Sequence, residues 1–323
     1  MNLDEITQPI TSELEIFDDR FREAMRSKVA FVDLIARYIV RQKGKKIRPA
    51  LVLLTAKACG EVNDSTYRGA SLVEILHTAT LIHDDVVDDA DTRRGLASIN
   101  AVWKNKIAVL MGDYMLAKGL LLSLDNDDFQ FLKITSDAVR RMSEAEILQI
   151  AKSRDLDIDE TTYLKIISDK TASLLSTCTQ IGAASVTTDN RIIGCMRDFG
   201  ENVGMVFQIR DDLLDYIGRK SITGKPTGLD MKEKKLTLPL IYSFTQAPRS
   251  QSKHILKIIK NGAKRKELQY VVEFAHEFGG IDYATKKAQH YSALALEALD
   301  PLPYSPANEA LKSFVDFVME RSK

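Results

Sequence analysis

The stretch that decides the fold runs from Asp189 to Asp215 and reads DNRIIGCMRDFGENVGMVFQIRDDLLD. Its apolar side chains recur at intervals of four and three residues, at Ile192, Met196, Phe199, Val203 and Val206. This spacing places them on one stripe of a long amphipathic helix, because an α-helix turns about 100° per residue. Asp189 follows two threonines and suits the N-cap position. The stretch therefore predicts a helix whose last turn concentrates aspartates.

The same helical spacing continues through most of the chain. It predicts further long helices over residues 65–89, 98–124, 129–152 and 160–185, with a shorter helix that has Pro49 in its first turn. The clearest predicted loop is Gly218–Lys235, which is rich in glycine and basic residues. No linker composition or fixed-period repeat divides the pattern. We therefore expect one all-α domain spanning residues 1–323, with long helices around a deep central cavity.

Composition narrows the classes of protein that remain. The 45 Lys and Arg residues balance 45 Asp and Glu residues, so the formal net charge is zero, which argues against a nucleic-acid partner. The three cysteines, Cys59, Cys178 and Cys195, form no CxxC pair and fit free thiols in a reducing compartment. We also find no signal-peptide pattern and no run near the roughly 18 uncharged apolar residues of a membrane span. These features predict a cytoplasmic protein without a membrane segment.

Two pentapeptides share the pattern DDxxD. The first spans Asp84 to Asp88 and the second spans Asp211 to Asp215, and each ends a long apolar helix. The first and last aspartates of each motif lie about 40° apart around the helix, and the second aspartate flanks them. Carboxylates this close repel one another unless a cation neutralises them, and hard oxygen ligands without His or Cys suit Mg²⁺. Two such motifs favour a Mg²⁺ site over a pair of solvated acidic helix ends.

Basic residues accompany the acidic motifs. They are Lys43, Lys45, Lys46 and Arg48 before Pro49, Arg93 and Arg94 after the first motif, and Lys225, Lys232, Lys234 and Lys235 after the second. This pairing predicts a pocket for a polyanion, in which Mg²⁺, arginine and lysine share the phosphate oxygens. There is neither a P-loop nor a GxGxxG motif, so a nucleotide cradle is not supported.

Two polar side chains share a helical face with the motifs. His77 lies two turns before Asp84, and Gln208 precedes Asp211 by three residues. We expect both to contact substrate. His83 faces another direction, and we expect a structural role for it.

Five segments together resemble the trans-isoprenyl diphosphate synthase (polyprenyl synthetase) family of the medium- and long-chain type. They are GKKIRP at 44–49, HTATLIHDDVVDDADTRRG at 77–95, KT at 170–171, FQIRDDLLD at 207–215 and GKPTGLDMKEKKLTLPL at 224–240. Lys43 and Lys234 stand where the family often has glycine. The resemblance implies the isoprenoid-synthase helical bundle, usually a homodimer. It also implies Mg²⁺-dependent condensation of an allylic diphosphate with successive isopentenyl diphosphate units to an all-trans polyprenyl diphosphate.

The resemblance also implies residue roles. A cluster of two to three Mg²⁺ ions would be held by Asp84, Asp85, Asp88, Asp211, Asp212 and Asp215. Isopentenyl diphosphate would be bound by Lys45, Arg48, His77 and Arg94. The allylic diphosphate would be contacted by Arg93, Lys170, Lys225 and Lys235, with Thr171 and Gln208 near the reacting carbon. The catalytic set would be Arg93, Lys170, Thr171 and Gln208.

Product length forms a separate hypothesis. The growing tail should run along the first motif's helix toward its N-terminus, past Ala79 and Thr80. Short-chain members of the family often have an aromatic residue at the Ala79 position, so small residues here indicate an open tunnel, and Ala79→Tyr should shorten the product. The deeper floor would be formed by Leu76, Met111, Met115 or Leu116. The alternative is tight packing of small residues.

Other functions remain open at this stage. One is a short-chain farnesyl or geranylgeranyl diphosphate synthase, and another is a terpene cyclase or head-to-head synthase. A terpene cyclase needs no second diphosphate site, so Lys45, Arg48 and Arg94 favour the condensing enzyme over it. A noncatalytic regulatory subunit of a heteromeric synthase is a third alternative, and the completeness of both acidic motifs argues against it.

Overall fold

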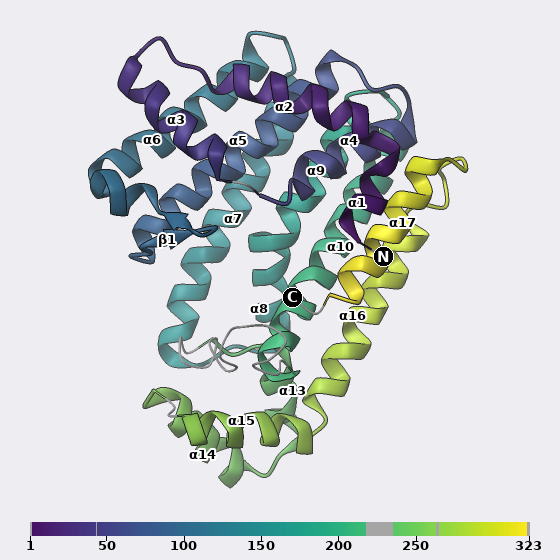
Figure 1. The fold of residues 1–323 in the computed structure, drawn as a ribbon. Coiled ribbons are helices and arrows are strands. Elements are labelled where there is room, and N and C mark those ends of the chain that lie inside the picture. Colours follow the sequence, from purple (N-terminus) through teal and green to yellow (C-terminus); the bar gives the residue numbers. More distant parts are fainter. Residues whose placement is uncertain (1, 43, 218–234, 263–264, 322–323) are drawn as a thin grey trace.

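The computed structural model describes residues 2–42, 44–217, 235–262 and 265–321, and these residues are almost entirely helical (Figure 1). A short hairpin pairs two strands of two residues each, β1 (Thr92–Arg93) and β2 (Leu96–Ala97), in antiparallel orientation. The helical segments, in chain order, are α1 (Leu3–Thr7), η1 (Gln8–Ile10), α2 (Thr11–Met25), α3 (Ala30–Arg41), α4 (Ile47–Cys59), α5 (Asp64–Val87), α6 (Ile99–Leu124), α7 (Phe129–Asp155), α8 (Glu160–Ile167), η2 (Ser168–Ala172), α9 (Ser173–Ala184), α10 (Asn190–Ile217), α13 (Leu238–Gln246), α14 (Arg249–Lys260), α15 (Arg265–Glu277), α16 (Gly280–Glu297) and α17 (Pro306–Met319).

The decisive stretch forms α10 as the spacing predicts. Asp189 is the residue before this helix, and its carboxylate accepts a 2.8 Å hydrogen bond from the backbone of Arg191. Met196, Phe199 and Val206 on the predicted stripe are fully buried. The predicted helices around the first motif also form, and Pro49 lies in the first turn of α4. The loop predicted at 218–235 lies almost entirely outside the described residues.

One predicted helix, residues 160–185, is interrupted. It divides into α8, the π turn η2 and α9. The apolar pattern continues through the turn, so spacing alone does not reveal it. π turns occur mostly as single insertions within α-helices, often at functional sites. The interruption contains Lys170 and Thr171, two of the expected site residues.

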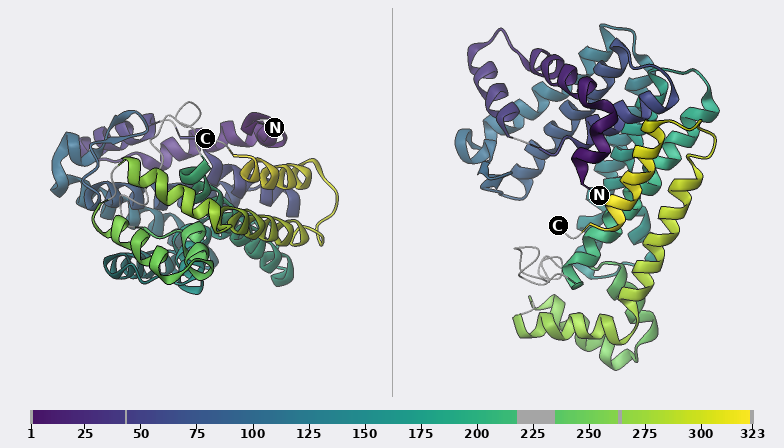
Figure 2. Two further views of the ribbon diagram at one scale, coloured as in Figure 1. Left: turned by 90° about the horizontal axis from the view of Figure 1, so that it is seen from below. Right: turned by 45° about the vertical axis from the view of Figure 1, so that its right-hand side comes forward.

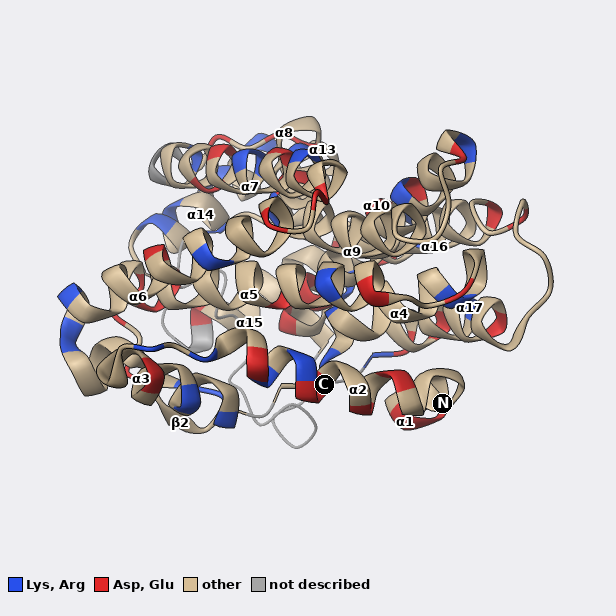
Figure 3. Cartoon of the chain, turned by 90° about the horizontal axis from the view of Figure 1, so that it is seen from above, with Lys and Arg blue, Asp and Glu red and all other residues tan. Residues whose placement is uncertain are grey.

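Among the described residues, the buried core consists of three clusters. The largest lies among α4, α5, α9, α10 and α17, the second joins α8 and the end of α10 to α13, α14, α15 and α16, and the third lies among α3, α5 and α6. Helix α10 contributes to the first two, while α14 and α15 lie together at one end of the molecule (Figures 1 and 2). Basic and acidic residues are interspersed along the outer helices, as a zero net charge suggests (Figure 3). A single domain stays a prediction.

Helix α6 passes a length and composition test for a membrane span. An 18-residue window in it has a mean hydropathy of 1.6, and 33% of that window is buried. The sequence prediction concerned uncharged apolar runs, whereas this test allows up to two charged residues in the window. Core helices of soluble proteins pass the same test. One side of α6 packs on α5 in the third cluster, while Leu110 and Leu121 on another side are exposed.

Candidate functional site

The first acidic motif lies at the C-terminal end of α5, where Asp88 is the C-cap residue. Asp84 and Asp88 are exposed, but the side chain of Asp85 is held inside the protein, and the residue is only 3% exposed. The Nε of Arg93 in β1 donates a 2.8 Å hydrogen bond to Asp85. The amide of Asn100 donates 3.2 Å bonds to the backbone oxygens of Asp85 and Ala90. These contacts fasten the chain as it leaves α5.

The second acidic motif repeats this arrangement on α10. Asp211 is exposed, whereas Asp212 is only 6% exposed. The two carboxylate oxygens of Asp212 accept hydrogen bonds of 2.6 Å from the Tyr163 hydroxyl and 2.7 Å from the Gln208 amide. Asp215 is half-buried. In both motifs, therefore, the second aspartate is engaged by neighbouring side chains and the first is accessible.

The π turn lies between the two motifs. Lys170 forms an ion pair with Glu146 and donates a 2.8 Å hydrogen bond to Gln149, both on α7. The Thr171 hydroxyl donates a 2.8 Å bond to the Oε1 of Gln208. The sequence analysis predicts that Lys170, Thr171 and Gln208 belong to one site. In the structure these three residues line the same cavity.

Two cavities meet at Lys170 and Thr171. One, of about 410 Å³, also contains Asp84 on its wall. The other, of about 230 Å³, contains Asp211, Asp212 and Lys235. The π turn thus connects a space at the first motif with a space at the second.

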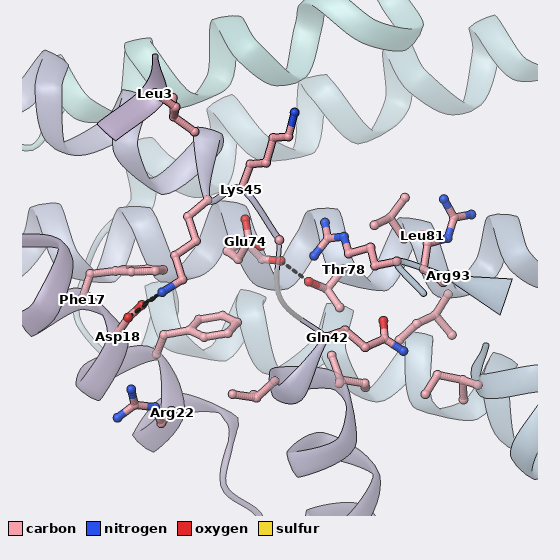
Figure 4. Close-up of a pocket in the computed structure, with 18 of the residues that line it drawn as sticks. Leu3, Phe17, Asp18, Arg22, Gln42, Lys45, Glu74, Thr78, Leu81 and Arg93 are labelled. Atoms are coloured by element: carbon pink, nitrogen blue, oxygen red, sulfur yellow. Dashed lines mark hydrogen bonds and ion pairs between the residues drawn. The ribbon is translucent and has the colours of Figure 1, made fainter. Parts of the chain in front are cut away.

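A third cavity, of about 980 Å³, lies beside the first motif and is lined by several basic side chains. Lys45, Arg93 and Arg94 lie on its wall, with Glu74 of α5 among them (Figure 4). Arg94 lies so close to the loop before α4 that a Cβ on Gly44 would be 2.5 Å from its Nη1. The resemblance implies that Arg93 contacts the allylic diphosphate; in the structure it lines the same cavity as Lys45, and its Nε donates a hydrogen bond to Asp85. Lys46 pairs with Asp18 at 2.6 Å.

Arg48 and His77 lie in the 410 Å³ cavity, which shares Leu81 with the 980 Å³ cavity. The buried Nε of Arg48 has no hydrogen-bond partner among the described protein atoms. Burial, reinforced by the positive charge of Arg48, lowers the pKa of His77 to about 2. The imidazole is therefore neutral at physiological pH and can contribute a hydrogen bond to a ligand but no positive charge. Burial also raises the pKa of Glu74, against the opposing effect of Arg48 and Arg94.

The accessible carboxylates suit a divalent cation. Partial burial and the negative charges of Glu146 and Asp88 raise the pKa of Asp84, so a cation placed there would relieve repulsion. Within the described ranges, no three His, Cys, Asp or Glu side chains form a ready cage. Carboxylate oxygens of this kind suit an ion such as Mg²⁺, which keeps waters and is completed by phosphate oxygens of a substrate.

The predicted chain-length residues divide between two places. Leu76 and Thr80 line a small cavity of about 10 Å³ that adjoins the 410 Å³ cavity at His77 and Thr80. Ala79, Met111 and Met115 are buried in the cluster among α3, α5 and α6, and Leu116 packs against it. Sequence reasoning missed the other walls of the small cavity, namely Thr135, Ala138, Val139, Met142, Leu174 and Thr177.

Further site neighbours were also missed, because no motif marks them. Tyr163 reaches Asp212 from α8, and Glu146 and Gln149 reach Lys170 from α7. Arg321, near the end of the chain, brings its Nη1 to 3.6 Å from Asp211. Of the basic residues predicted for the site, Lys43, Lys225, Lys232 and Lys234 lie outside the described residues.

The sequence model of the polyprenyl synthetase family matches residues 29–275. The chain belongs to the polyprenyl synthetase family. It is 36% identical over 318 residues to the all-trans-nonaprenyl-diphosphate synthase (geranyl-diphosphate specific) of Rhodobacter capsulatus, covering 98% of this chain and 97% of the relative. The crystal structure of a decaprenyl diphosphate synthase from R. capsulatus matches with a TM-score of 0.92 and 32% identity, covering 100% of both chains. A polyprenyl synthase from Caulobacter crescentus, crystallised with calcium and isoprenyl diphosphate, matches with a TM-score of 0.88 and 31% identity, covering 100% of this chain and 98% of that chain.

These similarities confirm the predicted family and the all-α isoprenoid-synthase fold. This polyprenyl synthetase is an enzyme, a prenyltransferase, as the sequence predicts. The names of the relatives favour a medium- or long-chain product over a short-chain one. The roles of individual site residues stay predictions.

Proposed function

We propose that this polyprenyl synthetase condenses an allylic diphosphate with successive isopentenyl diphosphate units and releases an all-trans polyprenyl diphosphate of medium or long chain. One observation carries the proposal: the accessible aspartates of two DDxxD motifs line cavities that meet at Lys170 and Thr171. A cavity with Lys45 and Arg94 on its wall adjoins the one at Asp84, with which it shares Leu81. The site therefore offers places for two diphosphates, which a terpene cyclase does not need.

We assign the metal to these carboxylates. Two to three Mg²⁺ ions would be held by the motif aspartates, with the accessible Asp84, Asp88 and Asp211 as the first ligands to test. Asp85 and Asp212 belong to the same motifs, and their hydrogen bonds to Arg93, Tyr163 and Gln208 also fix the shape of the site. When bound, Mg²⁺ would act as a Lewis acid on the departing diphosphate. A similar protein crystallised with calcium and isoprenyl diphosphate supports a divalent cation.

The residues of the chain perform the remaining work. Lys170 and Arg93 neutralise diphosphate charge as the bond from the allylic carbon to oxygen breaks. Lys45, Arg48 and Arg94 hold the diphosphate of isopentenyl diphosphate, and the neutral His77 supplies a hydrogen bond. The double bond of isopentenyl diphosphate then forms the new carbon–carbon bond, and its C2 proton leaves to the released pyrophosphate. Thr171 and Gln208 lie beside the reacting carbon, while apolar walls exclude water that would quench the cation.

A second copy of the chain completes the proposed assembly. Helix α6 exposes apolar side chains along one stripe, namely Val102, Val109, Leu110, Leu120, Leu121 and Leu124. A stripe of this length on a helix that also packs on α5 suits an isologous homodimer contact. The cytoplasmic location predicted from the sequence stays a prediction.

The test is incubation of the purified protein with isopentenyl diphosphate, Mg²⁺ and allylic primers of several lengths, followed by chromatography of the products. We expect condensation to fall steeply in Asp84→Ala and Asp211→Ala, and to persist in the control Asp198→Ala, an exposed aspartate on α10. The proposal would be refuted if both motif variants kept rates within about threefold of wild type, which corresponds to a change in activation free energy of less than about 0.7 kcal/mol. Turnover without isopentenyl diphosphate would indicate a cyclase, and no turnover by the protein alone would indicate a regulatory subunit.

A further inference from the structure

A network of charged side chains lies directly behind the π turn. Arg141 of α7 extends its guanidinium toward two other elements. Its Nε donates a 2.7 Å hydrogen bond to Asp169 in the π turn, and its Nη2 donates a 2.6 Å bond to Glu201 on α10. The same Nη2 lies 3.0 Å from the hydroxyl of Ser168, the first residue of the turn. One side chain thus joins α7, the π turn and α10.

The carboxylates of this network are fully engaged. The second oxygen of Asp169, which is buried, accepts a 2.8 Å hydrogen bond from Lys165 of α8. Glu201 accepts from Arg141 through both oxygens, at 2.6 and 3.2 Å, and from Ser168 at 2.5 Å. Two parallel bonds from a planar guanidinium restrict orientation as well as distance. The start of the π turn is therefore fixed in rotation and in position.

The other end of the π turn is fixed by close backbone packing. A Cβ added to Gly204 of α10 would lie 2.3 Å from the Cα of Ala172, the last residue of the turn. Only glycine permits this approach. The turn is therefore held at Ser168 and Asp169 by charge and at Ala172 by contact with α10. Lys170 and Thr171, which face the two cavities, lie between these fixed points.

We propose that Arg141 is a positioning residue for prenyl transfer: through Asp169 and Glu201 it sets where Lys170 and Thr171 stand relative to the second acidic motif. The inference rests on the proposed function of that site. Arg141 does not line the cavities described above, so it acts through the turn and not on the substrate. Its loss should therefore weaken the chemical step on the allylic diphosphate and leave the binding of isopentenyl diphosphate unchanged. Of the residues proposed to bind that substrate, Lys45 and Arg94 lie in another cavity. Arg48 and His77 share the 410 Å³ cavity with Lys170, but the hydrogen bonds described for Arg141 go to Ser168, Asp169 and Glu201.

The neighbouring residue supplies a matched control. Arg140 also pairs with two carboxylates, Asp137 at 2.6 Å and Glu144 at 2.9 Å, but on the exposed side of α7. We would compare Arg141→Met, Arg141→Lys and Arg140→Met in steady-state assays with farnesyl diphosphate, isopentenyl diphosphate and Mg²⁺. The expected result is a kcat lowered at least about tenfold in Arg141→Met, with KM for isopentenyl diphosphate within about twofold. Arg141→Lys should recover part of kcat, and Arg140→Met should match wild type.

Two further variants keep the inference testable if Arg141→Met does not fold, and Glu201→Gln is the milder of them. Glu201→Gln keeps the shape of the network and removes one charge, and Gly204→Ala displaces the turn from the opposite end. Both should lower kcat and spare KM for isopentenyl diphosphate. A wild-type kcat in the folded variants would overturn the inference, and so would equal changes in the KM values for farnesyl diphosphate and isopentenyl diphosphate. In either case an active wild-type enzyme would still uphold the proposed function. An inactive wild type would overturn both.

Discussion

The hydroxyl of Thr171 donates a 2.8 Å hydrogen bond to the Oε1 of Gln208, across 37 positions of sequence. The NH₂ of the same amide donates a 2.7 Å bond to Asp212, and the Tyr163 hydroxyl donates a 2.6 Å bond to the other oxygen of that carboxylate. Both the oxygen and the NH₂ of the Gln208 amide therefore form hydrogen bonds. A continuous chain of hydrogen bonds therefore leads from the π turn to the second acidic motif.

Tyr163→Phe tests this chain without changing the size of the ring. It removes a hydrogen bond to a buried carboxylate, which is worth about 1.5–3 kcal/mol. We expect a lower melting temperature and a kcat reduced about tenfold, or roughly 1.4 kcal/mol, because Asp212 and Gln208 lose a fixed orientation. Tyr304→Phe is the control, since Tyr304 is 83% exposed. A Tyr163→Phe enzyme with wild-type kcat would show that this orientation does not matter.

Much of the fold was predictable because apolar spacing persists over long helices. The Met196 and Phe199 stripe specifies α10, and Asp189 marks its start. The π turn was not predictable, because the features that hold it, such as the close approach of Gly204 to Ala172, are contacts between elements. Local spacing carries no signal of such a contact.

The candidate site shows the same division. Thr171 and Gln208 could be placed together because both belong to recognisable motifs. Arg141 and Tyr163 could not, because each acts through a partner far away in the sequence, Glu201 at 60 positions and Asp212 at 49. The sequence also could not show that the second aspartate of each motif is buried and the first exposed, because helical geometry gives the direction of a side chain and not its burial.

His77 should make the protein sensitive to mild acid. Burial holds its folded pKa at about 2, while the unfolded residue titrates near about 6.5. Between these values the unfolded state binds the extra proton, so this contribution to stability is complete above pH ~6.5 and declines as the pH falls. At pH ~5.5 the loss is about 1.4 kcal/mol.

Chemical denaturation of wild type and His77→Gln at several pH values measures this effect. The variant should lose less stability than wild type between pH ~7.5 and ~5.5, by about 1.4 kcal/mol. His290→Gln, an exposed change on α16, serves as the control and should follow wild type. Parallel curves for wild type and His77→Gln would contradict the assignment of this acid sensitivity to His77.

Product length should respond to Thr80 more cleanly than to Ala79. Thr80 lines both the small cavity and the 410 Å³ cavity, so Thr80→Phe would fill the space that leads away from the first motif. We expect shorter products on chromatography, with the first condensation preserved. Ala79 is fully buried among α3, α5 and α6, so Ala79→Tyr should also cost stability through overpacking, typically about 1–3 kcal/mol. Unchanged product length in Thr80→Phe would remove this cavity from the path of the tail.

The apolar stripe of α6 gives the prediction about assembly. Leu110 is 55% exposed and Leu121 is 53% exposed, and they lie three turns apart on the side away from α5. Burying a leucine against a partner gains about 1.5–3 kcal/mol, so two aspartates in their place should remove several kcal/mol from a symmetric contact that uses each residue twice. Light scattering after gel filtration should show a dimer for wild type and a monomer for Leu110→Asp/Leu121→Asp. Ile16→Asp, an equally apolar exposed site on α2, should remain dimeric. A wild-type monomer, or a double variant that stays dimeric, would show that this stripe has another role.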